Sequence, residues 1–522
     1  MSSLRLFWRT QIGYYLIPAL VLLGIVAIEW HKIMALNNGI FSYALDDAYI
    51  HLSMAKTLRT GWYGINPGEI ASSSSSILWP FLLTPFAYFT LYEKVPLILN
   101  IIFSLITLWF FIYIILLAHQ PSNTWQKIAM IFLFCLLVFI LNLVVLIFMG
   151  MEHSLQVLLS VLLVGGLILE SRSQHLPWWL AVVIILGPLV RYENLALSVP
   201  AIFYLFYRKH YKPTLLISLL TFGSLALFSL FLYYIEQPLL PASILAKSML
   251  GVSGSLFKVF SANLIENLSH IDGISFLLFL LYFALFFIFS YQASNNGPIS
   301  LVLISAFLLH LIFGKIYSYS RYELYLYAAI WLWLSYLVAG ELPQLKEKRI
   351  GNSVLLITLS LLVYQYTKVM ITLPIAANNI FEQQYQIGLF AKNYLKGPVA
   401  VNDIGLVSFN NPNYVLDLSG LGNTDIFKQR VFQKDSSWMN QLVERSDIQL
   451  AIIYKNWFHA IPDNWRLLGC MYLSKKRVST SQGVVYFYAT RAKYQPFLVE
   501  KLEQFKMKLP TDVVFKAQCG LN

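Results

Sequence analysis

Two adjacent aspartates, Asp46 and Asp47, lie in the segment Phe41-Ser-Tyr-Ala-Leu-Asp-Asp-Ala-Tyr-Ile50, which follows an apolar stretch. Paired carboxylates beside an apolar surface suit proton abstraction from a hydroxyl by a general base. They also suit a phosphate-bound divalent cation, either magnesium or manganese. A purely structural interpretation makes Asp46 a helix N-cap and Asp47 a first-turn acid that the helix dipole favours. Spacing alone favours this structural interpretation.

Secondary candidates surround this pair. His51 follows Asp47 by four residues and shares its helix face, as a further ligand, a hydrogen-bond partner or an interfacial side chain. Glu69 ends the turn sequence Asn-Pro-Gly-Glu at 66–69. The run Ser72–Ser76 is typical of a flexible linker.

A second group of charged residues stands at the ends of apolar blocks, where charge is expensive and usually faces a polar cavity. An Arg-x-Glu pair at i and i+2 does not face itself along a helix, so these residues are expected to pair with other helices or with a ligand. The arginines either form interhelical ion pairs or hold a phosphate. Lys247 is a candidate for a diphosphate, a lipid phosphate or anionic headgroups. The members of this group besides Lys247 are Glu152, Arg191, Glu193, Arg321 and Glu323.

Apolar residues at 48, 52, 55 and 58 recur at helical spacing. This pattern predicts an amphipathic helix over 47–60 that lies on the membrane surface and is stopped by Gly61. Asp46 and Asp47 are then at its N-terminal end.

The whole chain of 522 residues is 58% hydrophobic and only 12% charged, which excludes a soluble cytosolic enzyme. Apolar blocks of this length are typical of transmembrane helices. The stretch 77–92 contains two prolines and is expected to be re-entrant or interfacial, so the total is about 11–12 transmembrane helices. The eleven clear blocks lie near 12–31, 95–118, 126–148, 154–169, 177–190, 192–207, 213–235, 273–292, 297–314, 322–340 and 351–372.

The net charge of +12 does not indicate nucleic acid, because the basic residues lie in short connectors between apolar blocks. Placing Arg5 and Arg9 in the cytoplasm makes the connectors with Lys127 and Arg172 cytoplasmic as well. The outer loop 32–94 and the C-terminal region are then extracytoplasmic. We therefore expect a multi-pass protein of the bacterial inner (plasma) membrane.

From about residue 375 the apolar runs shorten and charged residues return. Short strands near 398–401, 414–418, 450–454 and 484–488, separated by helix-like stretches, predict a small α/β domain over 375–522. Cys470 and Cys519 in this domain either pair in an oxidising compartment or remain free thiols.

The order of motifs along the chain resembles that of the GT-C type polytopic glycosyltransferases, in particular a bacterial and mycobacterial subgroup that includes terminal arabinofuranosyltransferases. Two departures are the serine run, where that subgroup usually has a Gly-Tyr-Thr turn, and Tyr192, where it commonly has proline. The matching motifs are Asp-Asp-Ala-Tyr-Ile at 46–50, Asn-Pro-Gly-Glu at 66–69, Ser-Ile-Leu-Trp at 76–79, Gly-Met-Glu at 150–152, Arg-Tyr-Glu at 191–193 and Leu-Pro-Ala-Ser-Ile-Leu-Ala-Lys at 240–247.

The resemblance implies a transmembrane GT-C domain over 1–374 that transfers a hexose or pentose from a polyprenyl-phosphate donor on the outer face of the membrane. The acceptor is a glycan, glycolipid or glycoprotein of the cell envelope, and a single displacement inverts the anomeric carbon. The resemblance implies that Asp46 or Asp47 is the catalytic base and raises this role above simple capping. Glu152 and Glu193 become cavity acids, while Arg191, Lys247 and Arg321 become phosphate-side cations.

An alternative is a polytopic transporter or flippase for a lipid-linked glycan, with the buried charges along its path. A transporter needs no polar outer domain and often has two related halves, and neither expectation suits this sequence. Enzyme chemistry is therefore the preferred hypothesis.

Overall fold

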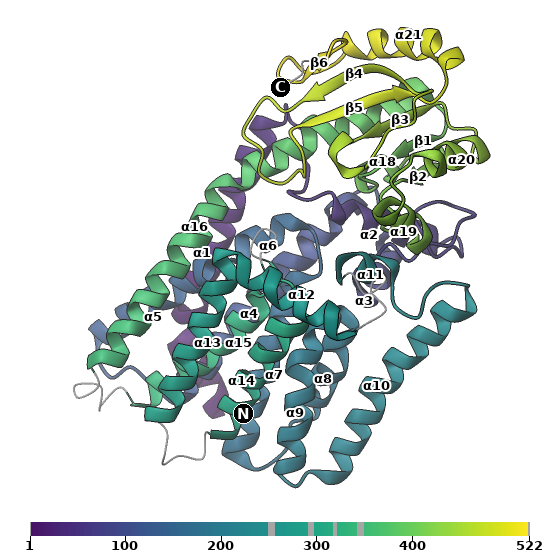
Figure 1. Cartoon of the computed structure of the whole chain (residues 1–522). Helices are drawn as coiled ribbons and strands as arrows, with labels where there is room; N and C mark the ends of the chain where they lie inside the picture. The colour runs from purple at the N-terminus through teal and green to yellow at the C-terminus, as the bar shows by residue number, and fades with distance from the viewer. Residues whose placement is uncertain (1, 249–255, 291–296, 317–320, 342–348, 520–522) are drawn as a thin grey trace. The chain divides into compact units, whose positions relative to one another are not determined.

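We describe the protein from a computed structural model that covers residues 2–248, 256–290, 297–316, 321–341 and 349–519 (Figure 1). These residues are mostly helical, with a six-stranded sheet near the C-terminus. The chain packs into two compact units. The helical unit contains residues 1–28, 97–227 and 255–371, and the sheet unit contains residues 29–96, 228–254 and 372–522. Asp46 and Asp47 therefore belong to the same unit as the C-terminal sheet.

Each of the predicted apolar blocks forms a helix. The block at 126–148 is divided at Asn142, whose positive φ of 47° interrupts the helix. Helices α1, α4, α10 and α16 continue from the helical unit into the sheet unit. The helices that correspond to the blocks are α1 (Ser2–Leu36), α4 (Val95–Ala118), α5 (Thr124–Ile140), α6 (Leu143–Met149), α7 (His153–Ser173), α8 (Trp178–Val190), α9 (Leu195–Tyr207), α10 (Tyr211–Tyr234), α13 (Ile271–Ser290), α14 (Gly297–Phe313), α15 (Leu324–Glu341) and α16 (Arg349–Ile380).

Several helices of the described residues are long enough to span a membrane. In the described residues, five helices have the length and composition for a crossing, or six if the pair 260–269 and 271–284, bent by 98°, counts as one span. Three further apolar helices are shorter, and the 13 residues of α8 reach only about 20 Å against a hydrocarbon core of about 30 Å. The total of 11–12 membrane spans stays a prediction, because this count covers the described residues alone.

The stretch 77–92 does not form a crossing helix. It contains α3 (Leu78–Leu83) and the short 3₁₀ turn Thr84–Phe86. Six residues of α-helix extend about 9 Å, which is far less than a membrane core. This agrees with the prediction of a non-crossing segment.

Helix α7 lies at the centre of the helical unit, where it packs against α8 and α15. Gly165 and Gly166 allow this close approach. A Cβ atom at Gly165 would overlap the Phe110 ring of α4, and a Cβ atom at Gly166 would overlap Leu180 of α8. Small residues at helix contacts are typical of packed membrane helices.

The C-terminal sheet has the strand order β2-β1-β3-β5-β4-β6. Strands β2, β1 and β3 are parallel, with Val399 opposite both Val415 and Leu450, whereas the remaining neighbours are antiparallel. The four predicted strands are confirmed, and β4 and β6 were not predicted. The strands are β1 (Val399–Val401), β2 (Val415–Asp417), β3 (Leu450–Ile453), β4 (Arg466–Tyr472), β5 (Val484–Ala489) and β6 (Val514–Lys516).

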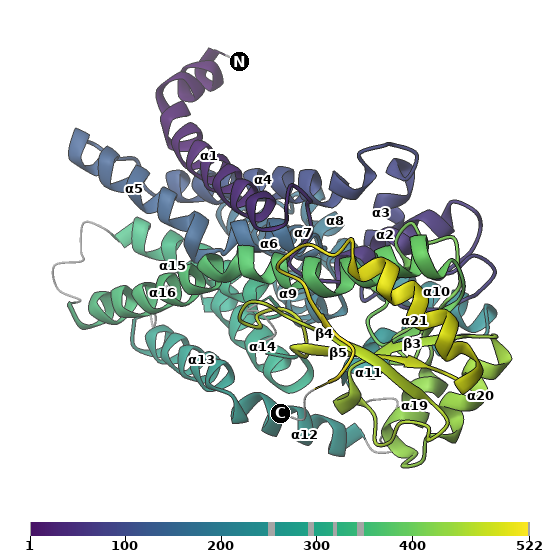
Figure 2. The ribbon, with the colours of Figure 1, turned by 90° about the horizontal axis from the view of Figure 1, so that it is seen from above.

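Helices cover both faces of this sheet. On one face, α19 (Thr424–Phe432) and α20 (Ser437–Arg445) bury Ile426 and Trp438 in one core with Ala451 and Tyr488. On the other face lies α21 (Gln495–Lys506), which is seen above the strands in Figures 1 and 2. Its Phe505 ring packs on Phe390, which in turn contacts Phe487 of β5. The three layers give the predicted α/β architecture.

A disulfide joins Cys470 of β4 to Cys519, beyond β6, with their Cα atoms 5.7 Å apart. The sequence left this pairing open, and the structure settles it in favour of a bond. Disulfides persist in oxidising compartments.

Candidate functional site

The predicted helix after Asp46 is present as α2 (Asp47–Leu58). Asp46 occupies the N-cap position, but its side chain makes no capping hydrogen bond to α2. Its two carboxylate oxygens instead each accept a hydrogen bond of 2.8 Å, from the backbone N–H groups of Gly405 and Leu406. The interpretation of Asp46 as a cap of its own helix is therefore wrong, and Asp46 links two segments that are 359 residues apart.

Helix α2 is not an amphipathic helix on a membrane surface. Nine of its twelve residues are buried, on all sides of the helix. It packs against α3 and against the short helix α18 (Gly405–Ser408). The predicted surface position fails because tertiary contacts also cover its polar residues, such as His51 and Ser53.

Three carboxyl groups interact near the start of α2. Asp47 and Asp403 are both close enough to Asp46 to raise the pKa of its carboxyl, although burial contributes most. Together these effects raise the pKa of Asp46 to about 8, against the opposing effect of the Gly405 and Leu406 N–H groups. All three aspartates are half-buried.

Asp403 is a site residue that the sequence reasoning did not select. Its Oδ2 atom accepts a hydrogen bond of 2.8 Å from the Gln384 amide, which also donates to the Tyr454 hydroxyl at 3.0 Å. Burial is the main cause that raises the pKa of Asp403 to about 6. The available signal was the short segment Asn-Asp-Ile-Gly at 402–405, directly after a strand, where site residues often lie.

His51 and the serine run form one buried polar cluster. The Ser74 hydroxyl lies 3.0 Å from Nδ1 of His51 and also donates to the Ser76 carbonyl. Ser72 Oγ accepts a hydrogen bond from the Ala242 backbone N–H in α11 (Ala242–Ser248). Since all five serines at 72–76 are at most 6% exposed, the prediction of a flexible linker is wrong.

Glu69 makes hydrogen bonds that hold the turn at 66–69. Its carboxylate accepts hydrogen bonds from the Asn66 amide at 2.6 Å and the Tyr414 hydroxyl at 3.1 Å. The side-chain N–H of Asn66 also donates to the Val415 carbonyl in β2, and the side-chain oxygen of Asn66 accepts from the Val415 N–H. These contacts attach the 66–69 turn to the edge strand of the sheet.

The second group of charges lies in the helical unit. Arg191 is 2% exposed, and its guanidinium donates to Glu152 at 2.6 Å and to Glu193 at 2.7 Å. The i, i+2 pair therefore forms, contrary to the helix-based expectation, because the backbone of Arg191 is extended with φ −153°. The contact with Glu152 is the interhelical ion pair that was one of the two predicted alternatives.

Arg321 joins the same group through an aromatic ring. The guanidinium groups of Arg191 and Arg321 lie 5.2 and 4.9 Å from the centroid of the Tyr322 ring. Arg321 also donates to the Met151 sulfur, at 3.1 Å. Glu323 is buried and precedes α15. The structure thus brings together four predicted residues beside Tyr322, namely Glu152, Arg191, Glu193 and Arg321. Glu323 directly follows Tyr322 in the sequence.

Lys247 lies in α11, within the sheet unit, and its side chain is outside the described part of the structure. The predicted site residues thus divide between the units. Asp46, Asp47, His51 and Glu69 belong to the sheet unit with Lys247, and the arginine group belongs to the helical unit.

A divalent cation at Asp46 and Asp47 stays a prediction. Both oxygens of Asp46 already accept backbone hydrogen bonds. Within the described ranges, no group of three or more His, Cys, Asp or Glu side chains is arranged to hold a metal ion. Magnesium and calcium need several oxygen ligands around one point. No step is therefore assigned to a metal.

Comparison with known proteins gives one sequence match. Residues 378–492 match a family described as Domain of unknown function (DUF8728), which covers most of the C-terminal sheet. No curated protein matches the chain in sequence.

Three solved structures from Archaeoglobus fulgidus are similar to the chain at low identity. The oligosaccharyltransferase in the apo form is 11% identical with a TM-score of 0.43, over 83% of this chain and 69% of that chain. The oligosaccharyltransferase AglB in complex with an inhibitory peptide and a dolichol-phosphate is 10% identical with a TM-score of 0.39, over 95% of this chain and 75% of that chain. The oligosaccharyltransferase complex with Zn and sulfate is 11% identical with a TM-score of 0.40, over 94% of this chain and 74% of that chain.

Proposed function

We propose that this protein is a membrane glycosyltransferase of the GT-C type, which moves a sugar from a polyprenyl-phosphate donor to a hydroxyl of a cell-envelope glycan, glycolipid or glycoprotein. The observation that carries the proposal is the cluster of three half-buried carboxyl groups, Asp46, Asp47 and Asp403. Asp46 and Asp47 follow the apolar helix α1 in the sequence. The ordered motifs of the sequence support the same chemistry.

Within the pair, we assign the base to Asp47. Both oxygens of Asp46 accept backbone hydrogen bonds, so Asp46 is the positioning residue that fixes the start of α2. Asp47 is the next residue and is half-buried in the first turn of α2. A carboxylate there can accept a proton from an acceptor hydroxyl within hydrogen-bond reach.

The proposed reaction is a single displacement. The acceptor oxygen forms a bond to the anomeric carbon while its proton passes to Asp47. The bond from that carbon to the lipid-phosphate oxygen breaks, and the phosphate departs with the electron pair. Lys247, which belongs to the same unit as Asp47, is the proposed phosphate-side cation. Arg191 and Arg321 belong to the helical unit, where Arg191 lies between two carboxylates, and no step of the reaction is assigned to them.

The proposal places the chain in a bacterial plasma membrane, with the C-terminal sheet outside the cytoplasm. The Cys470–Cys519 disulfide supports this orientation, because such bonds persist in oxidising compartments. The helices with the length of membrane spans support a multi-pass protein.

The test is sugar transfer in membranes that contain Asp46→Asn, Asp47→Asn or the control Asp463→Asn, whose aspartate is exposed in the same unit. We expect Asp47→Asn to lower the transfer rate by about a hundred-fold or more, because general-base catalysis contributes about 10²–10⁴-fold. Its thermal stability should stay close to that of the wild type. Asp46→Asn should lower both stability and transfer. Wild-type transfer by Asp47→Asn protein at equal abundance would refute the assignment.

A further inference from the structure

The length of helix α1 indicates which part of the sheet unit lies at the level of lipid headgroups. Its apolar span, Ile12–Leu36, has 25 residues and extends about 37 Å, whereas the hydrocarbon core of a bilayer is about 30 Å thick. The last turns of α1, over 30–36, therefore pass beyond the core into the headgroup region. These turns belong to the sheet unit, so side chains of this unit that contact them lie at the headgroup level.

Lys94 is the first cation at this level. Its ammonium group lies 5.4 Å from the centroid of the Trp30 ring, and tryptophan is enriched at membrane interfaces. Lys94 also ends the 3₁₀ turn η2 (Tyr92–Lys94), in which the apolar span Tyr92–Ala118 begins. The contact with α1 and the start of this second span therefore place Lys94 at the same edge of the hydrocarbon core.

The turns before Lys94 expose apolar side chains. Tyr88, Phe89 and Leu91 are 73%, 60% and 58% exposed. The Tyr92 N–H donates to the Phe89 carbonyl at 3.1 Å, and the Lys94 N–H donates to the Leu91 carbonyl at 2.8 Å. These bonds keep the exposed side chains close to Lys94. Exposed apolar residues that adjoin one another mark an interaction surface, and a membrane interface is the partner that fits their position.

Arg59 adds a second cation to this surface. Its guanidinium lies 4.3 Å from the centroid of the Tyr88 ring and donates to the Ala87 carbonyl at 3.4 Å. Burial lowers the pKa of the Lys56 ammonium, and the neighbouring cations Arg59 and Lys392 lower it further. Three cations therefore lie close together at this end of α2, where they attract anions.

The loop between β4 and β5 brings two further cations to the headgroup level. The Asn378 side chain of α16 donates to the Leu36 carbonyl at the end of α1, at 3.2 Å. The next residue, Asn379, donates to the Lys476 carbonyl, also at 3.2 Å. Hydrogen bonds thus hold this loop close to the last turn of α1. The side chains of Lys476 and Arg477 are exposed there.

Acidic residues near these cations do not cancel the positive charge. Glu29 pairs with Lys32 at 2.7 Å, and Glu382 lies 3.5 Å from Lys475. Each of these acids thus has its own lysine. Glu93 is half-buried and precedes Lys94, whose charge it balances only in part.

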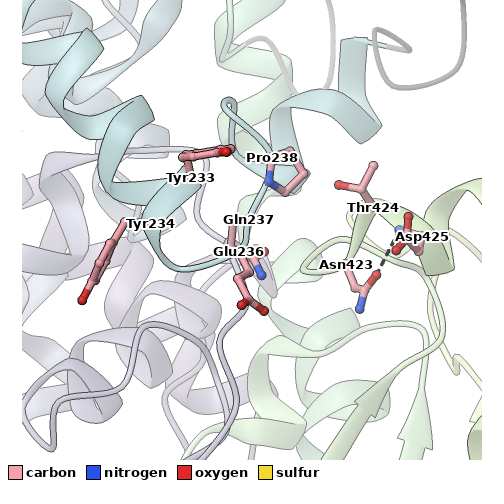
Figure 3. A pocket seen from close by; sticks show the side chains of 8 residues that line it. All are labelled: Tyr233, Tyr234, Glu236, Gln237, Pro238, Asn423, Thr424 and Asp425. Atoms are coloured by element: carbon pink, nitrogen blue, oxygen red, sulfur yellow. Dashed lines mark hydrogen bonds between the residues drawn. The ribbon is translucent and has the colours of Figure 1, made fainter.

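The end of α10 adds aromatic rings of the kind found at membrane interfaces. Its span Tyr211–Tyr234 ends in Tyr233 and Tyr234, which are 71% and 85% exposed. Figure 3 shows the Tyr234 ring on the side of α10 away from Asn423 of α19. The next charged residue in the sequence, Glu236, is acidic. This end therefore fits the interface through its rings, whereas attraction to anionic lipid belongs to the cations described above.

We propose that a basic surface of the sheet unit binds the phosphate groups of anionic phospholipids and so holds this unit on the bilayer. The inference rests on the multi-pass membrane protein of the proposed function, and it does not require sugar transfer. Each lysine or arginine near an anionic membrane surface strengthens binding by about five-fold. The members of the basic surface are Arg59, Lys94, Lys476 and Arg477.

The test measures the melting temperature of the full chain in detergent micelles to which phosphatidylglycerol, phosphatidylcholine or inorganic phosphate is added. A ligand that binds only the folded protein raises the melting temperature. We expect phosphatidylglycerol to raise it more than phosphatidylcholine does, and inorganic phosphate to leave it unchanged. High salt should reduce the difference between the lipids, because salt screens exposed charges. In Lys94→Gln/Lys476→Gln, half of the phosphatidylglycerol effect should require an at least about ten-fold higher lipid concentration.

The matched control is Lys434→Gln/Lys508→Gln, which removes two exposed lysines from other parts of the same unit. This control should respond to the lipids like the wild type. Lys476→Arg keeps the charge and should also respond like the wild type, whereas Lys476→Glu should reduce the response. The proposal is overturned if both lipids act equally on the wild type. It is also overturned if the basic-surface variant responds like the control, since the lipid then binds elsewhere on the chain.

Failure of the lipid surface and failure of the transferase are distinguishable. Asp47→Asn protein should respond to phosphatidylglycerol like the wild type while it transfers no sugar. A specific phosphatidylglycerol effect in a wild type without transfer activity would retain the lipid surface and reject the transferase. Equal effects of the two lipids on a wild type that transfers sugar would reject the lipid surface and retain the transferase.

Discussion

Asp46 and Asp47 are neighbours of the same type, yet the structure gives them different environments. Asp46 uses both carboxylate oxygens to hold the backbone of α18. Asp47 starts α2 and interacts electrostatically with Asp46 and Asp403. One residue of the pair thus fixes the geometry and the other is the proposed base. Sequence spacing does not distinguish these roles.

The raised pKa values make stability depend on pH in a definite direction. The pKa of Asp46 rises to about 8 and that of Asp403 to about 6, from an ordinary value of 3.8. The folded state therefore binds more protons than the unfolded state above pH 3.8, so stability falls as pH rises through these values. The melting temperature, measured between pH 5 and 9, should fall less steeply with pH in Asp46→Asn than in the wild type or Asp463→Asn. Equal slopes in all three proteins would contradict this assignment of the raised pKa.

The buried ion pair of Arg191 gives a second prediction at this scale. Removing Glu152 leaves a buried guanidinium with one carboxylate, because Glu193 alone remains. Loss of one partner of a buried pair typically costs about 3–5 kcal/mol, whereas an exposed pair contributes less than about 1 kcal/mol. Glu152→Ala should therefore lower the unfolding free energy far more than Glu444→Ala, whose partner Arg491 is 40% exposed. Comparable losses in the two variants would show that the buried pair contributes little.

The elements around the acidic pair depend on buried polar contacts. The serine run touches α2 through Ser74 and His51, and it touches α11 through Ser72. Ser76 also accepts from the Trp79 N–H at the start of α3. A polar run that resembles a linker in composition therefore holds three helices through hydrogen bonds, because buried hydroxyls need partners.

Loss of the Ser74 hydroxyl should loosen this arrangement. Ser74→Ala removes the group that bonds His51 and the Ser76 carbonyl, which leaves buried polar groups unpaired. We expect the free energy of unfolding to fall by about 1–3 kcal/mol and proteolysis within the 70–78 segment to become faster. Ser481→Ala, at an exposed serine of the same unit, should change neither measurement. Unchanged proteolysis in both variants would mean that the serine contacts are dispensable.

At the scale of the whole molecule, the chain combines apolar helices with a disulfide-bonded α/β sheet. The disulfide closes a loop of 49 residues that includes the end of β4 together with β5, α21 and β6. A disulfide that closes a loop of this length should contribute about 2–4 kcal/mol to the free energy of unfolding. Cys470→Ser should lower the melting temperature, and reductant should lower that of the wild type to the same value. A reductant effect of equal size in Cys470→Ser would exclude the disulfide as its cause.

Much of the helical organisation could be predicted from the sequence. Apolar blocks as long as 95–118 form helices because a buried backbone must satisfy its own hydrogen bonds. The strands of the tail were found where short apolar runs lie between turn signals. The total of 11–12 membrane spans stays a prediction, since apolar composition marks a buried helix as well as a spanning one.

The sequence by itself determined a mostly helical, apolar protein with a small α/β domain, and it selected Asp46, Asp47 and the arginine group by their rarity in apolar surroundings. Tertiary structure alone decided that Asp46 bonds Gly405 and Leu406, that Asp403 joins the acids, and that the serine run is buried. Local patterns act over a few residues, whereas these contacts join segments hundreds of residues apart. Their partners are set by packing, which no spacing along the chain encodes.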